Sequence, residues 1–173
     1  MIIGKFASRL FHHSHIGVFQ FPTGADAIEQ NAHFGASAGA FAERIAKLIA
    51  DTPNPVLVGH SFGASVLLKY LVDAVPQPSF AGLFLIATPF WGPDFPEFAL
   101  PADFGARLRD VSPLFLYHSR DDHEVPFEHV ERYSRALPQA TVRAVDGRGH
   151  EFNQAGFPEL VADIRQLKEG RTA

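Results

Sequence analysis

Short apolar runs alternate along this chain with longer segments whose apolar residues repeat at helical spacing. The runs predict five strands, at about 16–21, 56–58, 81–87, 114–118 and 141–145. Apolar residues at 41, 45, 48 and 49 repeat at helical spacing and predict an amphipathic helix over about 37–50. Further helices are predicted near 66–75, 127–137 and 158–168.

The order of these elements predicts the fold class. Residues 81–87 are apolar throughout, which is typical of a strand buried on both faces of a parallel sheet. Strands and helices alternate with short linkers, so we expect an α/β fold: a mostly parallel sheet with helices on both faces and right-handed crossovers. The length of 173 residues is enough for one domain, 1–173, with a sizeable core.

Composition narrows the class of protein. The 46% hydrophobic and 20% charged content is that of an ordinary globular protein. The net charge of −4, without a basic block, argues against a nucleic-acid partner. No apolar run reaches the length of a membrane span, and the N-terminus lacks the pattern of a signal peptide, so we expect a cytoplasmic protein. The absence of cysteine excludes disulfides and thiolate chemistry.

A glycine-serine motif follows the second predicted strand. Gly59-His60-Ser61-Phe62-Gly63 separates the apolar run at 56–58 from the apolar segment at 66–72. Strand, Gly-x-Ser-x-Gly and helix form the nucleophile elbow, in which the glycines let the strand and helix pass closely and the serine projects above the sheet. The alternative is an ordinary strand-to-helix turn in which Ser61 caps the helix.

A serine nucleophile needs a base, and the base needs a carboxylate. Asp122 and His150 each come just after a predicted strand, as Ser61 does, so parallel strands would bring all three to one edge of the sheet. Asp121 competes for the acid role. Asp122 stands three residues before Val125-Pro126, and on this spacing we assign Asp122 to the acid and Asp121 to a turn cap. His60 is expected to pack or to form a hydrogen bond elsewhere.

The chain from about residue 16 to residue 167 resembles the α/β-hydrolases, in particular the small serine hydrolases related to retinoblastoma-binding protein nine. The matching motifs are Gly59-His60-Ser61-Phe62-Gly63, Asp122-His123-Glu124-Val125-Pro126 and Gly149-His150-Glu151-Phe152, in the order Ser…Asp…His. The resemblance implies an α/β-hydrolase fold and a catalytic triad of Ser61, Asp122 and His150. It also implies hydrolysis of a small-molecule carboxylic ester, or less often an amide, through an acyl-enzyme, without a cofactor.

The N-terminus departs from this family. Its members usually have a strand and a His-Gly loop that supply one donor of the oxyanion hole, whereas the N–H of Phe62 supplies the other. Either Met1-Ile2-Ile3 is a shortened version of that strand, with Gly4-Lys5-Phe6 as the donor loop, or the fold is N-terminally shortened. In the second case the strands at 16–21 and 56–58 would be separated by a gap or would pair directly. An uncovered edge would invite pairing with another chain, so a homodimer is one expectation.

A proline-rich aromatic segment follows the strand at 81–87. Phe90, Trp91, Phe95 and Phe98 either line a substrate pocket, for which we select Phe90 and Trp91, or pack the segment onto the core.

No metal site is expected. His12, His13 and His15 lack a nearby carboxylate and a helical His pair, and we interpret them as solvated loop residues. His123 and His129 are expected to be exposed.

Two hypotheses of function follow. The first is a serine hydrolase of the carboxylesterase type. The second is a non-catalytic binding protein on the same fold, with an incomplete oxyanion hole.

Overall fold

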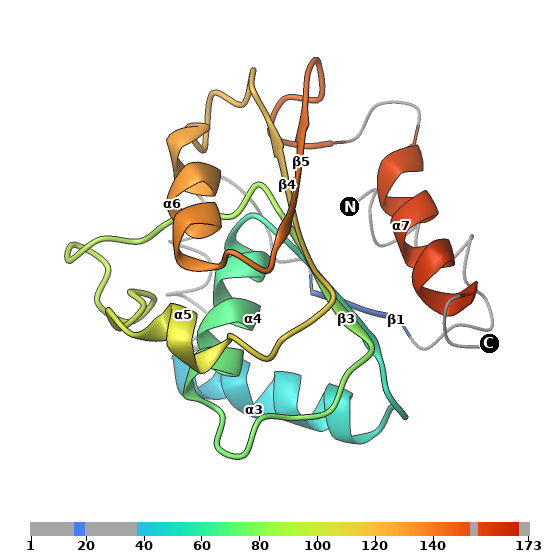
Figure 1. The fold of residues 1–173 in the computed structure, drawn as a ribbon. Helices are drawn as coiled ribbons and strands as arrows, with labels where there is room; N and C mark the ends of the chain where they lie inside the picture. The colour runs from blue at the N-terminus through green and yellow to red at the C-terminus, as the bar shows by residue number, and fades with distance from the viewer. Residues whose placement is uncertain (1–15, 20–37, 153–155, 170–173) are drawn as a thin grey trace.

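The structure is a computed structural model that describes residues 16–19, 38–152 and 156–169, and all structural statements concern these residues. Its strands are β1 (Ile16–Phe19), β2 (Val56–His60), β3 (Gly82–Ile86), β4 (Leu114–Ser119) and β5 (Thr141–Val145). Its helices are α3 (Ala38–Ala50), α4 (Phe62–Asp73), α5 (Phe104–Arg107), α6 (Glu128–Ala136) and α7 (Pro158–Glu169). Figure 1 shows their arrangement. Each predicted element is present, and α5 adds a short helix within the segment expected to be irregular.

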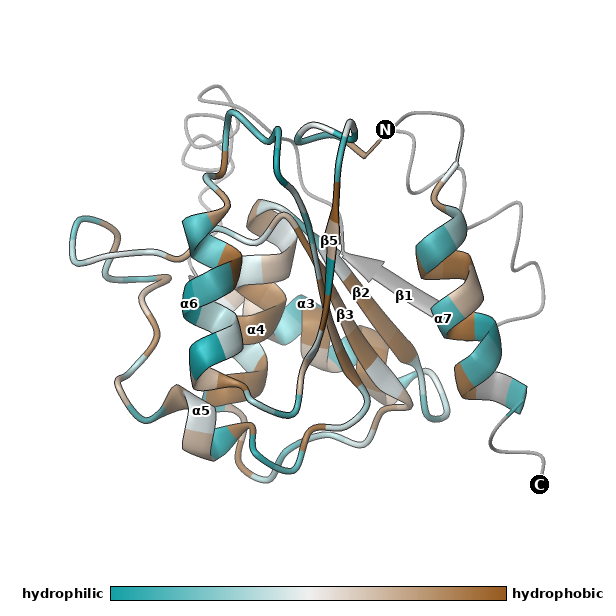
Figure 2. Ribbon diagram, turned by 45° about the horizontal axis from the view of Figure 1, so that its top comes forward, coloured by the Kyte–Doolittle hydropathy of each residue, from teal (hydrophilic) through white to brown (hydrophobic). Residues whose placement is uncertain are grey.

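The strands form one parallel sheet in the order β1-β2-β3-β4-β5. Each crossover steps in the same direction across the sheet, so right-handed connections place their helices on one face. Figure 2 shows α3, α4 and α6 on that face and α7, which follows the last strand, on the opposite face. The predicted parallel sheet with helices on both faces is therefore confirmed.

The strands β1 and β2 are direct neighbours. Ile16 pairs with Val56 and Phe19 with Gly59, in parallel register. Of the arrangements considered from the sequence, the structure has direct pairing, with neither a strand nor a gap between them. The segment Met1–Ile3, which was the other candidate, lies outside the described residues.

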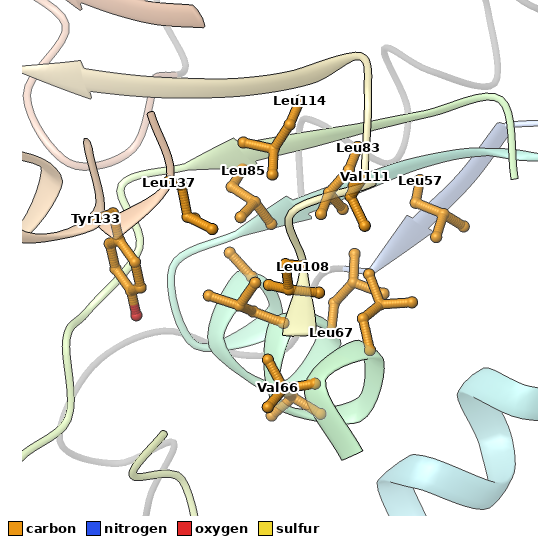
Figure 3. Close-up of a cluster of buried hydrophobic side chains, with 14 of the residues drawn as sticks. Leu57, Val66, Leu67, Leu83, Leu85, Leu108, Val111, Leu114, Tyr133 and Leu137 are labelled. Carbon is orange, nitrogen blue, oxygen red and sulfur yellow. The ribbon is translucent and has the colours of Figure 1, made fainter. Parts of the chain in front are cut away.

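Two apolar cores cover the two faces of the sheet because side chains alternate along each strand. On β3, Leu83 and Leu85 face the core shared with α3, α4 and α6, part of which Figure 3 shows. Phe84 and Ile86 face the core shared with α7. Burying one such side chain contributes about 1.5–3 kcal/mol, so both faces stabilise the sheet that carries the site.

A polar network fixes α7 to the sheet. The buried carboxylate of Asp163 accepts a hydrogen bond from the Tyr117 hydroxyl at 2.7 Å. It also accepts two from the Arg143 guanidinium, at 2.8 and 3.0 Å. Burial would raise the pKa of Asp163, but the bonds from Arg143 and Tyr117 outweigh it and lower that pKa. The bidentate pair with Arg143 joins β5 to α7, and the bond from Tyr117 joins β4 to α7. Within the described residues, no helix is long and apolar enough to cross a membrane.

Candidate active site

Ser61 lies in a sharp turn between the end of β2 and the start of α4. Its backbone has φ 51° and ψ −127°, a left-handed conformation that costs about 1–3 kcal/mol in a residue other than glycine. The turn also brings Gly59 against α4, since a Cβ on Gly59 would lie 2.6 Å from the Cα of Ala64. The N–H of Ser61 donates to the Ile86 carbonyl at 2.8 Å and ties the turn to β3. This geometry is that of a nucleophile elbow, as the motif predicts.

The structure brings Ser61, His150 and Asp122 into one hydrogen-bonded chain. The Ser61 Oγ lies 2.8 Å from His150 Nε2, and His150 Nδ1 lies 2.9 Å from Asp122 Oδ2. A carboxylate only accepts hydrogen bonds, so Nδ1 carries the ring proton and Nε2 is left to accept the proton of Ser61. All three side chains are buried.

The loop after β4 holds the Asp122 carboxylate in place. Asp122 Oδ1 accepts the backbone N–H groups of Glu124 at 2.9 Å and Val125 at 2.8 Å. Burial would raise the pKa of Asp122, but the hydrogen bonds from His150 and from these N–H groups outweigh it and lower that pKa. The group is therefore ionised at neutral pH and can stabilise a His150 imidazolium.

His150 experiences two opposing effects. Burial disfavours the imidazolium, whereas the hydrogen bond and the charge of Asp122 favour it, with a further contribution from Glu124. The net effect raises the pKa of His150 above its ordinary value. Glu124 Oε2 lies 3.7 Å from His150 Nε2, on an exposed side chain. The arrangement therefore favours a basic imidazole beside the serine.

Asp121 has a different role from its neighbour. Asp121 Oδ1 accepts the N–H groups of Gly147 at 3.1 Å and Gly149 at 3.3 Å, and the hydroxyl of Ser119. The Ser119 Oγ in turn accepts the N–H of Arg148 at 3.1 Å. These contacts join the loop after β4 to the loop after β5. Asp121 thus holds the backbone next to His150 rather than its imidazole ring, and the N–H groups that it accepts come from the loop after β5 rather than from its own turn.

Two further buried histidines surround this chain of hydrogen bonds. His60 Nε2 donates to the backbone carbonyl of His150 at 2.8 Å, which fits the expectation that His60 forms a hydrogen bond away from the serine. His118 Nε2 donates to the Val125 carbonyl at 2.8 Å and lies 3.6 Å from Asp122 Oδ2. Burial lowers the pKa of both rings. His118 was missed as a site residue because in sequence it only ends an apolar strand.

The prediction for His129 was wrong. His123 is exposed as expected, but His129 is half-buried and its Nδ1 accepts the backbone N–H of Phe90 at 2.8 Å. Burial lowers the pKa of His129, with further effects from Arg132 and His118. The contact fixes the start of the aromatic segment against α6.

The aromatic segment divides into two parts. The rings of Trp91 and Phe98 pack near Phe62, the residue after Ser61, with centroids 6.3 and 4.9 Å from it. Phe95 packs on Trp91 at 4.8 Å. The ring of Phe90 packs instead on side chains of α5 and α6.

The ring of Phe90 lies 5.0 Å from that of Tyr133 and 6.1 Å from that of Phe104. These contacts fit the alternative in which the side chain packs the segment onto the core. Trp91 packs among the aromatic rings beside Phe62, and its buried Nε1 has no hydrogen-bond partner among the described residues. The choice of Phe90 as a substrate contact is therefore not supported by its position.

Phe62 is the first residue of α4, where backbone N–H groups point out of the helix end and the helix dipole is positive. This position fits the oxyanion donor expected from the sequence. The other donor considered there, in the first residues of the chain, lies outside the described residues. His12, His13 and His15 lie outside them too, and no group of three or more potential metal ligands occurs in the part of the chain that is described.

Solved structures with similar folds include several hydrolases. Esterase PE8 is 21% identical, with a TM-score of 0.62 over 95% of this chain and 84% of that chain. A carboxylesterase of the ammonia-oxidizing thaumarchaeon Nitrososphaera gargenis is 10% identical, with a TM-score of 0.62 over 78% and 74%. The ydeN gene product of B. subtilis is 15% identical, with a TM-score of 0.62 over 78% and 76%. At these identities the likeness shows a shared fold.

The match of this chain to a known protein family agrees with the fold. No curated protein matches the chain. Residues 13–113, more than half of the chain, match the Alpha/beta hydrolase family. This match agrees with the parallel sheet and the elbow at Ser61, and we conclude that the chain belongs to the alpha/beta hydrolase family.

Proposed function

We propose that this protein is a serine hydrolase that cleaves a carboxylic ester through an acyl-enzyme on Ser61. The observation that carries the proposal is the chain of hydrogen bonds from Ser61 Oγ to His150 Nε2 at 2.8 Å and from His150 Nδ1 to Asp122 at 2.9 Å. A serine is a weak nucleophile at neutral pH unless a base takes its proton, and a raised pKa of His150 suits that task. The further likeness to hydrolases related to retinoblastoma-binding protein nine is part of this proposal.

In the first half of the reaction, Ser61 Oγ attacks the ester carbonyl carbon and its proton passes to His150 Nε2. The carbonyl oxygen becomes an oxyanion, which the Phe62 N–H and the N-terminal end of α4 stabilise. The tetrahedral intermediate collapses, the bond to the alcohol breaks, and His150 gives its proton to the departing oxygen.

In the second half, water attacks the acyl carbon and gives a proton to His150. The new intermediate releases the carboxylic acid, and the proton returns from His150 to Ser61 Oγ. Asp122 accepts from His150 Nδ1 throughout, which keeps the ring in the productive tautomer and stabilises its charged form.

One observation favours a second function, a binding protein without turnover. β1 pairs directly with β2, so no strand lies between them to carry the second oxyanion donor found in relatives. Loss of one such donor costs about 10²–10³-fold in kcat. The alternative is therefore a non-catalytic binding protein on the same fold, with an incomplete oxyanion hole.

Labelling with a fluorophosphonate probe distinguishes the two. We expect the wild-type protein to be labelled, Ser61→Ala and His150→Ala not to be, and intact mass with peptide mapping to locate the adduct on Ser61. Ser65→Ala is the matched control, because Ser65 is a buried serine one turn along α4 whose Oγ donates to Pro89 rather than to a histidine. If folded wild-type protein is not labelled and hydrolyses no p-nitrophenyl ester, the serine hydrolase proposal is wrong.

A further inference from the structure

The carboxylate of Glu124 lies beside the His150 ring and takes no part in the proposed proton transfers. Its Oε2 is 3.7 Å from His150 Nε2, the atom that lies 2.8 Å from Ser61 Oγ. Glu124 stands two residues after Asp122, and its backbone N–H donates to Asp122 Oδ1 at 2.9 Å. The turn that holds the acid therefore also fixes the position of Glu124 next to the ring.

The Glu124 carboxylate is accessible to a ligand. Its side chain is 53% exposed, whereas that of His150 is 4% exposed. Among the described residues its ion pair is with His150, and the nearby guanidinium groups of Arg120 and Arg148 pair with other carboxylates, at 3.2 and 3.1 Å. Glu124 therefore presents a negative charge to solvent at the place where the ring meets the substrate.

The charges around His150 favour a cation on the Nε2 side of the ring. Burial lowers the pKa of His150, whereas Asp122 and then the charges of Glu124 and Glu151 raise it, and the net shift is upward. Charges that favour a proton on the ring also favour another cation close to it. Asp122 faces Nδ1 and Glu124 faces Nε2, so Glu124 lies on the side of the ring where the reaction occurs.

The leaving group of an ester must come close to this carboxylate. His150 Nε2 gives its proton to the departing oxygen, and the two atoms must then lie about 2.6–3.2 Å apart. Because Nε2 is 3.7 Å from Glu124 Oε2, the departing oxygen lies within about 7 Å of the carboxylate. A nitrogen two carbons beyond that oxygen reaches about 3–4 Å further and can contact the carboxylate.

We propose that Glu124 selects esters whose alcohol carries a positive charge, with an ammonium group about two carbons from the ester oxygen. The proposal rests on the proposed function and adds the class of leaving group. The bond between the acyl carbon and the alcohol oxygen breaks, the oxygen takes the proton from His150 Nε2, and the acyl group stays on Ser61. Glu124 forms no covalent bond and transfers no proton, since its charge acts by attracting the cation.

Two isosteric esters test the proposal. Butyrylcholine and 3,3-dimethylbutyl butyrate differ in a quaternary nitrogen that replaces a carbon, and a pH-stat measures the acid released from both. The positive nitrogen also makes choline a better leaving group, so the cationic-to-neutral ratio of kcat/KM is compared between wild type and Glu124→Gln. The ratio also cancels effects of Glu124 on His150 that are common to both esters. We expect the ratio to fall at least about threefold in Glu124→Gln, the size expected for two partly exposed charges in contact.

Glu128→Gln is the matched control. Glu128 is an exposed glutamate in the first turn of α6, so its substitution changes the net charge equally. Its charge affects His118, and it is not one of the main charges that affect His150. We expect this variant to keep the ratio within about 1.5-fold of wild type, because salt screens a more distant charge. Thermal denaturation establishes that both variants are folded.

Salt provides a second readout that a purely structural role of Glu124 would not change. Raising NaCl from about 10 mM to about 1 M shortens the Debye length from about 30 Å to about 3 Å. We expect the ratio of the wild-type protein to fall towards that of Glu124→Gln, whose own ratio changes little.

The outcomes separate the two proposals. If folded Glu124→Gln keeps the wild-type ratio, or if Glu128→Gln lowers it equally, the role of Glu124 is wrong and the hydrolase proposal stands. If fluorophosphonate labels Ser61 but neither ester is turned over, labelling rates with methylphosphonothiolates that release thiocholine or 3,3-dimethylbutanethiol replace kcat/KM, and an equal ratio in both proteins overturns the role. If no probe labels Ser61 and no ester is hydrolysed, both proposals are wrong.

Discussion

Replacing Asp122 by asparagine should abolish proton transfer from Ser61 without removing any atom from the site. Asp122 Oδ1 accepts two backbone N–H groups, from Glu124 and Val125, and an amide nitrogen cannot accept them. The asparagine oxygen therefore takes the Oδ1 position, and its NH₂ takes the Oδ2 position, 2.9 Å from His150 Nδ1.

Two donors cannot face each other at that distance. His150 must then carry its proton on Nε2 and leave Nδ1 bare to accept from the asparagine NH₂. An Nε2–H cannot take the proton of Ser61, whose Oγ lies 2.8 Å away. The same change in other Ser-His-Asp triads lowers kcat about 10⁴-fold, which corresponds to about 5.4 kcal/mol of activation free energy.

The neighbouring carboxylate supplies the matched control. In Asp121→Asn the amide oxygen still accepts from Gly147 and Gly149, because all of the hydrogen bonds described for Asp121 use Oδ1. We expect kcat for p-nitrophenyl butyrate to change less than about fivefold in this variant, within the range of a surface change of about 0.5–1 kcal/mol. If Asp122→Asn keeps a tenth or more of the wild-type kcat while Asp121→Asn loses a hundredfold, the assignment of the acid is wrong.

Three further predictions follow from other parts of the structure. Because the pKa of His150 is raised and its imidazolium cannot accept a proton, kcat/KM should fall as the pH drops, with an apparent pKa above 6.5; an acid limb below 6.5 would contradict this. Gly59→Ala should lower the Tm by at least about 4 °C, since its Cβ would meet the Cα of Ala64 at 2.6 Å, whereas Gly92→Ala, with open space around it, should change the Tm by less than about 2 °C; equal shifts would refute the close approach. Asp163→Asn should cost about 1.5 kcal/mol and lower the Tm by about 3–6 °C in a thermal melt, because it weakens the bonds to β4 and β5; an unchanged Tm would contradict the role given to that network.

Some features of this protein could be predicted from the sequence because they depend on neighbouring residues. The apolar run before Gly59 and the apolar helix after Gly63 define strand, turn and helix within about fifteen residues, so the elbow at Ser61 could be predicted locally. Alternation of runs and helices likewise predicted the parallel sheet, and the carboxyl ends of parallel strands bring Ser61, Asp122 and His150 to one edge.

Other features depend on contacts between residues far apart in the chain. Asp121 and Asp122 are adjacent in one turn: the motif around Asp122 favoured it as the acid, but the contact that establishes this comes from the loop after β5, about 28 residues later. His60 contacts the carbonyl of a residue 90 positions away. No local pattern encodes such pairs.

Some residues could not be assigned from the sequence for the same reason: their contacts come from distant parts of the chain. Phe90 and Trp91 are neighbours in an irregular segment, but their rings point to opposite surroundings, Tyr133 and Phe62, that different helices provide. Direct pairing of β1 with β2 and a cavity between α3 and α4 likewise arise only when the elements pack. The elements, and the residues that could do the chemistry, could be predicted from the sequence alone, because local propensity and turn geometry act over a few residues. The tertiary structure decided which side chains meet, because those contacts depend on how distant segments fill the space between them.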